Sequence, residues 1–203
     1  VILPGSKSTL IDLAYLRASG LAARLLAFVN HEAARGGEVV GICGGFQMLG
    51  LEVRDPGGLE SSEKVAPGLG LLPVITELLP NKTLARTTLR HVETGLELVG
   101  YEIHHGVTTL APGREDMAVV LQDMDGRPAG YADATGRVWG CYLHGLFDAD
   151  EFRRWYVDWL RYRRGLAPAG SILARYEVAP ALDRLAETLR RSLDWAALRR
   201  LLG

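Results

Sequence analysis

Cysteine is scarce in this sequence, and neither sign of charge is in clear excess. The 203 residues include two cysteines, and 23 lysines and arginines nearly balance 24 aspartates and glutamates, for a net charge of -1. Two cysteines cannot build a disulfide framework, which indicates a reducing, cytoplasmic compartment. A net charge near zero gives no electrostatic reason to expect nucleic acid or a membrane as a partner.

Long apolar runs and metal-ligand spacings are missing as well. No stretch approaches the ~20 apolar residues of a transmembrane helix, and the start at 1–4 lacks the features of a signal peptide. No Cys-x-x-Cys or His-x-x-x-His spacing predicts a metal site. The first residue is not methionine and the chain opens inside an apparent strand, so we expect a missing segment upstream.

What remains is an ordinary globular composition, with 48% apolar and 23% charged residues. Apolar patterning predicts strands at 1–3 and 38–42, each followed by helical sequence, and this order favours a parallel sheet flanked by helices. The helical patterns cover 6–19, 21–35, the turn after residue 45, and two stripes at 152–160 and 182–193. We therefore expect one α/β domain over residues 1–203.

The middle of the chain predicts an antiparallel addition to that sheet. A surface loop is expected at 52–70, followed by short strands separated by turn residues. The expected strands cover 71–76, 84–91, 97–104, 118–122, 129–133 and 137–143, with turns at 80–81, 113, 125–126 and 135–136.

Cys43 stands where a predicted strand gives way to a predicted helix, in the run Gly-Ile-Cys-Gly-Gly-Phe-Gln at 41–47. A tight strand-to-helix turn pushes its side chain out of the sheet, and glycine neighbours let the backbone bend and a substrate approach. The helix N-terminus that follows would favour a thiolate and an anionic intermediate. A cysteine buried as a small hydrophobic residue is the alternative, but the glycine pattern favours a nucleophile.

His144 is the candidate partner, because it lies at the end of a predicted strand, where active groups of α/β folds gather. A structural role is the alternative for this histidine. Two further histidines, His104 and His105, are rival bases, although a lining or structural role suits them better. Strand alternation places Cys141 on the face away from His144, which predicts a core position and no working disulfide with Cys43.

The turn at Gly5 offers a second set of backbone donors. Its Gly-Ser-Lys-Ser string lacks the spacing of a phosphate loop, so nucleotide binding is not expected there. Its backbone N–H could instead face that of Gly44 and form an oxyanion hole, in which each donor contributes ~10²–10³ in rate.

Four segments together resemble the glutamine amidotransferase domain of the cobyric acid synthase family, which is class I-type and flavodoxin-like. The segments are ILPGSKST (2–9), GICGGFQMLG (41–50), GYEIHHG (100–106) and YLHGLFD (142–148). The first cysteine motif marks class I-type amidotransferases broadly, and the last two narrow the resemblance to this branch.

The resemblance implies a division of labour between two domains. Cys43 would attack glutamine to form a glutamyl thioester and ammonia, His144 would be the general acid and base, Gly5 and Gly44 the oxyanion donors, and Gln47 a contact to bound glutamine. An N-terminal synthetase domain, outside this chain, would use ATP and Mg²⁺ to amidate the corrinoid adenosylcobyrinic acid a,c-diamide, and this domain itself would need no cofactor.

Two departures from the motifs matter. Cys141 replaces an expected threonine, and Leu146 stands where many class I enzymes place a glutamate; the resembled family also lacks it, so a Cys–His dyad is expected. Other readings stay open: an amidotransferase for a cell-wall lipid intermediate or cobyrinic acid, a catalytically silent docking domain, or a cysteine hydrolase or redox protein.

Overall fold

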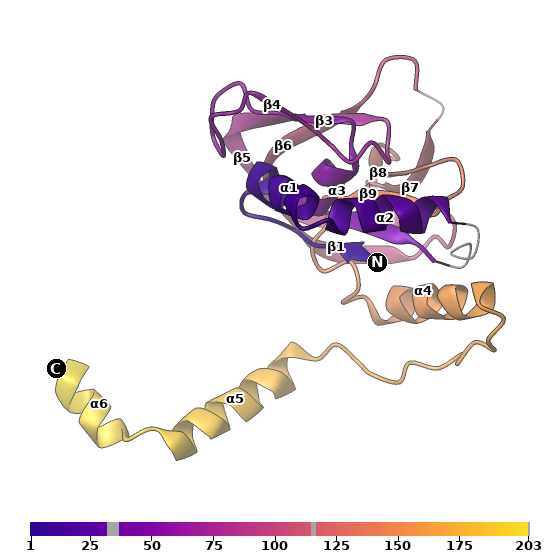
Figure 1. The fold of residues 1–203 in the computed structure, drawn as a ribbon. Coiled ribbons are helices and arrows are strands. Elements are labelled where there is room, and N and C mark those ends of the chain that lie inside the picture. The colour runs from indigo at the N-terminus through magenta and orange to yellow at the C-terminus, as the bar shows by residue number, and fades with distance from the viewer. Residues whose placement is uncertain (32–36, 115–116, 203) are drawn as a thin grey trace. The chain divides into compact units, whose positions relative to one another are not determined.

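The computed structural model describes residues 1–31, 37–114 and 117–202. The chain divides into a larger compact unit, Val1–Ser171, and a smaller one, Ile172–Gly203. The larger unit holds the β-sheet and every candidate site residue (Figure 1).

A nine-stranded mixed sheet, counted over the described residues, forms the centre of the larger unit. Its order is β1-β2-β9-β8-β7-β5-β3-β4, with β6 paired to β5. The strands are β1 (Ile2–Leu3), β2 (Val39–Ile42), β3 (Glu52–Arg54), β4 (Val65–Pro67), β5 (Val74–His91), β6 (Glu97–Leu110), β7 (Ala118–Gln122), β8 (Pro128–Ala132) and β9 (Val138–Cys141).

The parallel part of the sheet carries the cysteine turn. β2 lies between β1 and β9 and is parallel to both, and β3 is parallel to β5. The middle strands β5 to β8 pair antiparallel, and β8 joins them to β9. The expected α/β class, with antiparallel strands added to a parallel core, is confirmed.

Two local expectations were wrong. The predicted loop at 52–70 begins and ends with short strands, β3 and β4, which pair antiparallel; three residues each are too few to show alternation in sequence. The predicted turn at 80–81 is an irregularity inside β5, where the register shifts between Leu78 and Thr83. Pro80 cannot donate to a sheet, and so it interrupts pairing without reversing the chain.

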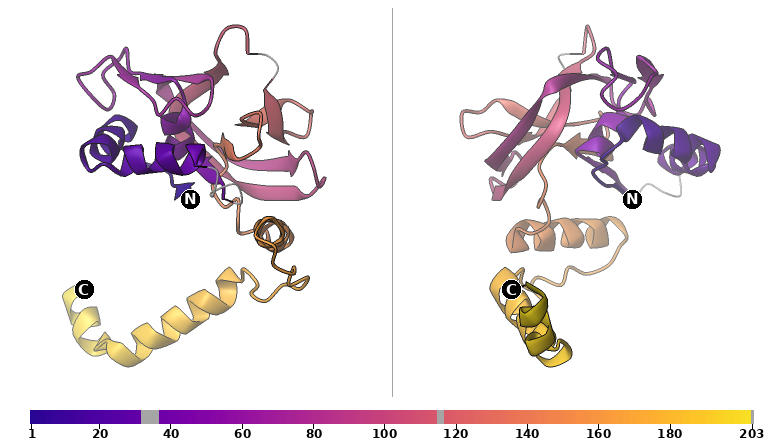
Figure 2. Two further views of the ribbon diagram at one scale, coloured as in Figure 1. Left: turned by 45° about the vertical axis from the view of Figure 1, so that its right-hand side comes forward. Right: turned by 90° about the vertical axis from the view of Figure 1, so that its left-hand side faces the viewer.

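Helices cover both faces of the sheet in the larger unit (Figure 2). They are α1 (Thr9–Ala18), α2 (Leu21–Asn30), α3 (Gly44–Leu49) and α4 (Asp150–Arg163). The expected helix at 21–35 ends at Asn30 in the structure, and residues 32–36 lie outside the described ones.

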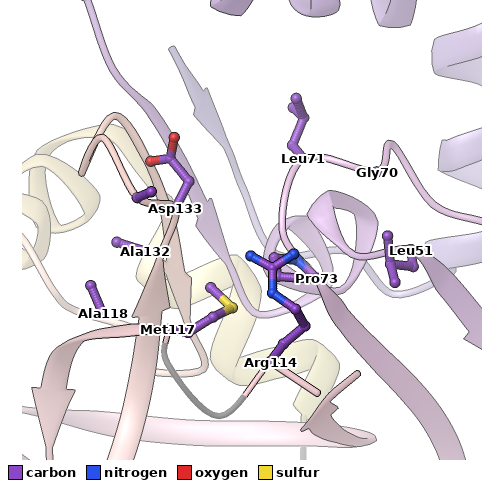
Figure 3. A pocket seen from close by; sticks show the side chains of 10 residues that line it. Leu51, Gly70, Leu71, Pro73, Arg114, Met117, Ala118, Ala132 and Asp133 are labelled. Carbon is purple, nitrogen blue, oxygen red and sulfur yellow. The ribbon is translucent and has the colours of Figure 1, made fainter. Parts of the chain in front are cut away.

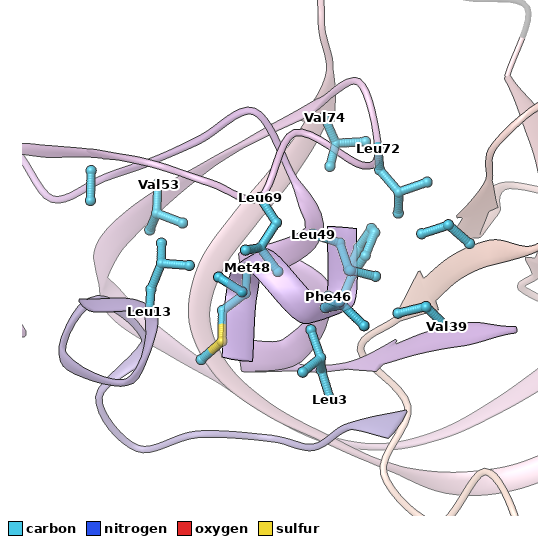
Figure 4. Packing of buried hydrophobic residues seen from close by; sticks show 14 of the residues in the cluster. Leu3, Leu13, Val39, Phe46, Met48, Leu49, Val53, Leu69, Leu72 and Val74 are labelled. Carbon is cyan, nitrogen blue, oxygen red and sulfur yellow. The ribbon is translucent and has the colours of Figure 1, made fainter. Parts of the chain in front are cut away.

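Two apolar cores lie on opposite faces of the sheet. The first joins α1, α2 and α3 to the strands, with Phe46 and Leu49 of α3 at its centre (Figure 4). The second packs α4 on the other face, and includes Trp139, Phe152 and Tyr156. The aromatic stripe on α4 is therefore core packing, as its spacing predicted.

A buried carboxylate fixes α4 to the sheet. Glu38, 4% exposed, accepts hydrogen bonds from Trp139 Nε1 (3.2 Å) and Trp159 Nε1 (2.8 Å) and an ion pair from Arg163 (2.9 Å). An uncompensated buried charge costs several kcal/mol, so these donors make one position of α4 strongly preferred. The amphipathic helix thus closes the face opposite α1 and α2.

The smaller unit contains α5 (Val178–Ser192) and α6 (Trp195–Leu202). The leucines of the stripe predicted at 182–193 are exposed, and all of them except Leu193, which caps the helix, lie on α5. Among the described residues, no helix has the length and apolar character needed to cross a membrane.

Candidate active site

Cys43 occupies a strained turn between β2 and α3. Its φ of 53° and ψ of -112° make it the one non-glycine residue at positive φ in the described part of the chain. Such a backbone costs ~1–3 kcal/mol and persists where the surroundings enforce it. A Cβ built on Gly45 would lie 2.0 Å from the Leu3 carbonyl oxygen, so only glycine lets the turn pack on β1.

His144 and Cys43 meet at Gly5. A Cβ built on Gly5 would lie 2.8 Å from Cε1 of His144 and 3.6 Å from Cβ of Cys43. Both side chains therefore converge on the bare Cα of Gly5, where any larger residue would displace the imidazole. The structure thus brings together two residues that are a hundred positions apart in sequence.

Tyr101 holds His144 in place. The two residues form an isolated antiparallel bridge, with His144 N–H donating to Tyr101 O (2.8 Å) and Tyr101 N–H to His144 O (3.2 Å). The tyrosine ring stacks on the imidazole at 4.9 Å and 8°. Gly100 permits this approach, since a Cβ there would lie 2.0 Å from His144 O.

The His144 ring keeps one nitrogen available. Its Nε2 is buried and has no hydrogen-bond partner among the described residues. Burial lowers the pKa of His144, nearby His104 lowers it further, and the Glu102 carboxylate partly offsets both. A lowered pKa keeps the imidazole neutral at pH 7, which is the form that can accept a proton.

The resting cysteine favours the thiol rather than the thiolate. Burial raises the pKa of Cys43 above its ordinary 9.0, the hydrogen bond from Gly44 N–H partly offsets this, and the Glu102 and Glu60 charges raise it further. The thiolate expected from the helix N-terminus is thus outweighed by desolvation, because α3 has only six residues and Cys43 is 4% exposed. Nucleophilic attack then requires a base, and His144 is the candidate for that role.

We expect alkylation of Cys43 by iodoacetamide to show an inflection above pH 9. A raised pKa means that the protonated form persists as pH increases through the ordinary value. The rate would be measured by mass spectrometry from pH 6 to 10.5 in a Cys141→Ala background, with unfolded protein as the reference thiol. An inflection well below that of the unfolded protein would contradict this assignment.

A cavity of about 240 Å³ opens beside Cys43. It is lined by backbone and side chains from the turn at Ser6, from α3, from the loop between β3 and β4, and from β5 and β6. The lining residues are Ser6, Lys7, Thr9, Cys43, Gln47, Leu59, Glu60, Lys82, Ile103, His104 and His105. The Sγ of Cys43 donates weakly to Ile103 O at 3.7 Å, and both residues belong to the lining.

Sequence reasoning missed Glu60 and Lys82 in this lining. Both lie in segments interpreted as a surface loop or a turn, and pairing of β3 with β4 and β5 with β6 is what places them beside the cysteine. The available signal for Glu60 was Asp55-Pro56-Gly57, a turn sequence that ends three residues before this acidic residue.

Gln47 lines the cavity, but its amide is already engaged. Its Oε1 accepts from Thr9 Oγ1 at 2.9 Å, and its Nε2 donates to the Tyr142 hydroxyl at 3.3 Å. The Tyr142 hydroxyl also bonds Thr108 Oγ1 at 2.5 Å. Gln47 therefore links α1, α3 and β6 beneath the site, and its contact to bound glutamine stays a prediction.

The rival histidines are both engaged by other groups. His104 Nδ1 donates to Gly106 O (2.7 Å), and its Nε2 faces Glu102 at 3.3 Å. His105 Nδ1 bonds Leu79 O at 3.0 Å. Both line the cavity, which agrees with the lining role expected for them.

Cys141 is part of the second core and is 0% exposed. Both cysteines are free, and Leu143, on the same side of the strand, is buried with Cys141. The strand-face argument is confirmed, and Cys141 takes no part in the site.

The assignment of the Gly5 and Gly44 N–H groups as oxyanion donors remains a prediction, and the position of the two glycines beside Cys43 is compatible with it. Gly44 lies against Ser6, since a Cβ there would sit 2.8 Å from the Ser6 nitrogen. The turn at Gly5 and the start of α3 therefore flank the cysteine from two sides. Within residues 1–31, 37–114 and 117–202, no group of three His, Cys, Asp or Glu residues could hold a metal ion.

A second cavity, of about 270 Å³, lies away from the cysteine (Figure 3). Its lining includes Leu71, Arg114, Met117 and Asp133. The Asp133 carboxylate already accepts from the Arg137 and Val138 N–H groups at 2.9 Å. The candidate nucleophile Cys43 lines the smaller cavity and not this one.

A strained cysteine turn, a histidine beside it and an adjoining polar cavity on an α/β sheet define a glutamine amidotransferase domain of the class I type. The model of the CobB/CobQ-like glutamine amidotransferase domain matches residues 1–152, and the chain belongs to that family.

Relatives with curated names agree with this family assignment. The chain is 46% identical to a cobyric acid synthase of Nitratidesulfovibrio vulgaris, covering 100% of this chain and 43% of the relative. It is 48% identical to a cobyric acid synthase of Cereibacter sphaeroides, covering 98% and 38%. The chain thus spans less than half the length of these relatives.

A solved structure shows the same fold at low sequence identity. The crystal structure of a glutamine amidotransferase matches with a TM-score of 0.55 and 19% identity, over 81% of this chain and 78% of that one.

Proposed function

We propose that this chain is the glutaminase part of a cobyric acid synthase, supplying ammonia for the amidation of adenosylcobyrinic acid a,c-diamide in cobalamin biosynthesis, in the cytoplasm. The observation that carries the chemistry is the convergence of Cys43 and His144 on Gly5 beside a polar cavity. The similarity to cobyric acid synthases along the whole chain supports the acceptor.

The first half of the reaction consumes the amide. His144 takes the thiol proton as Cys43 Sγ bonds to the side-chain carbonyl carbon of glutamine. The carbonyl oxygen becomes an oxyanion facing the N–H groups of Gly44 and the Gly5 turn. His144 then returns the proton to the departing nitrogen, so that ammonia leaves and a glutamyl thioester remains.

The second half regenerates the cysteine. Water attacks the thioester carbon, with His144 as base; the carbon–sulfur bond breaks, the thiol recovers its proton, and glutamate leaves. Ammonia is then used by the remainder of the longer protein, an N-terminal synthetase domain, where ATP and Mg²⁺ would activate the corrinoid carboxylates.

The test uses the complete protein with ATP and Mg²⁺. With glutamine as nitrogen donor, we expect the a,c-diamide to be amidated and one glutamate to form for each amide, measured by mass spectrometry and glutamate assay. Asparagine should not replace glutamine. Glutamate formation that is coupled to a cell-wall lipid or to cobyrinic acid, and not to the a,c-diamide, would transfer the proposal to that acceptor. Absence of any glutamine hydrolysis would refute the glutaminase itself.

A further inference from the structure

The cavity beside Cys43 carries one side chain of each charge that the mechanism does not use. Glu60 comes from the loop between β3 and β4, and Lys82 from the irregular stretch of β5. Both charges act on the Cys43 thiol, Glu60 raising and Lys82 lowering its pKa. Two segments separate in sequence therefore place opposite charges within electrostatic reach of the sulfur.

Glu60 is held in position by backbone donors. Its carboxylate accepts from Leu10 N–H at 3.3 Å and from the N–H of Thr9, at the start of α1. The loop behind it is fixed by Asp55, 0% exposed, whose carboxylate accepts the N–H groups of Leu59 (2.7 Å), Glu60 (2.8 Å) and Ser61 (3.1 Å). The loop therefore presents Glu60 at a fixed place over the cavity.

Glu60 still has acceptor capacity for a cation. A carboxylate offers about four lone-pair sites, and the Leu10 and Thr9 N–H groups are the donors that lower its pKa. In the described part of the chain no lysine or arginine forms an ion pair with it. Burial raises its pKa, with Asp55 adding to this, so a cation brought into the cavity would be stabilised by an incompletely compensated negative charge.

Lys82 is exposed and has no carboxylate within ion-pair distance over the described ranges. A second lysine of the lining, Lys7, comes from the turn before α1. Lys82 comes from β5 and is the lysine whose charge lowers the pKa of Cys43. It is therefore the better placed to pair an anion bound next to the sulfur.

We propose that Glu60 and Lys82 bind the α-ammonium and the α-carboxylate of a free amino acid, so that its side-chain amide faces Cys43. This deepens the proposed function and rests on it. One zwitterion pairs both charges at once, whereas a glutamine within a peptide, or a simple amide, leaves both unpaired. Leaving polar groups without partners is what makes such a site selective.

Two charge-removing variants test the assignment. In Glu60→Gln and Lys82→Met, we expect the KM for glutamine to rise about 10- to 100-fold, the range for loss of a hydrogen bond to a charged group, with kcat changed less than about threefold. Glu63→Gln, at an exposed residue of the same loop, is the matched control, and Lys7→Met tests the rival lysine of the cavity lining. A larger KM effect for Lys7→Met than for Lys82→Met would overturn the carboxylate assignment.

Truncated substrates separate the two contacts. The 2-hydroxy analogue of glutamine lacks the ammonium, and 4-aminobutanamide lacks the α-carboxylate. Glu60→Gln should lose the preference for glutamine over the hydroxy analogue and keep its preference over 4-aminobutanamide, and Lys82→Met should show the reverse. Unchanged preferences in both variants would overturn the proposal.

Two further measurements keep the outcomes distinct. Alkylation of Cys43 by iodoacetamide, which carries no amino-acid head group, should persist in the folded variants. It should be somewhat faster in Glu60→Gln and slower in Lys82→Met, because the two charges shift the pKa of the thiol in opposite directions. Thermal unfolding should match the parent protein. If the parent protein hydrolyses glutamine and the variants keep its KM, this inference fails alone. If the parent protein shows no hydrolysis, the proposed function fails, and the inference with it.

Discussion

Cys43→Ser is expected to lower glutamine hydrolysis by about 10⁴-fold or more while sparing amidation driven by free ammonia in the complete protein. Serine keeps the size of the side chain, but its hydroxyl is a far weaker nucleophile than a thiol assisted by one neutral histidine. Ammonia bypasses the thioester, so the synthetase reaction has no need of the sulfur. The measurement is amide formation with each nitrogen donor in turn.

The other cysteine provides the control for this variant. Cys141 is free and buried in the second core, so Cys141→Ala should keep hydrolysis within a few-fold of the parent protein. Equal loss of glutamine-driven and ammonia-driven amidation in Cys43→Ser would place the cysteine outside the glutaminase step.

His144→Gln is expected to reduce glutamine hydrolysis by about 10²–10⁴-fold, the usual contribution of a general acid and base. Glutamine lacks a group that can take a proton from a thiol whose pKa is raised. Rapid quenching should show loss of the glutamyl thioester burst, and the variant should lose the acid limb of the kcat/KM profile. In the parent protein that limb should lie below pH 6.5, since the pKa of His144 is lowered from that value.

An exposed histidine serves as the comparison. His31→Gln should leave both the burst and the pH profile unchanged, because His31 lies outside the site. A normal thioester burst in His144→Gln would remove this residue from the mechanism.

The geometry bears on the remaining alternatives. A docking domain without catalysis gains nothing from a cysteine at φ 53°, held there by glycine contacts and facing a polar cavity. Strain of this kind is retained at sites that use it. The choice of acceptor, by contrast, is proposed to belong to the remainder of the longer protein, and the experiment with the a,c-diamide tests it.

Much of the fold was predictable because local signals agreed. The glycine run around Cys43 and the apolar strand before it predicted the turn, and β7 lies at the predicted residues. The loop at 52–70 and the turn at Pro80 were misjudged, since β3, β4 and the middle of β5 are fixed by pairing with distant strands. Pairing of that kind leaves little trace in a short window of sequence.

The candidate reacting residues could be proposed from the sequence, whereas the residues that hold them in place could not. Cys43 and His144 each follow a strand, and parallel pairing of β2 with β9 brings those strand ends together. The group that orients His144 could not be foreseen, because the Tyr101 bridge and stack depend on β6 crossing near the chain after β9.

The sequence by itself was enough to propose Cys43 as the candidate nucleophile and His144 as its candidate partner, and to predict the core position of Cys141, because glycine spacing and strand alternation are local properties of the chain. Only the tertiary structure decided the protonation of the sulfur and the lining of the cavity. Desolvation and charge act through space: burial raised the pKa of Cys43 against the helix end, and strand pairing brought Glu60 and Lys82 to its side.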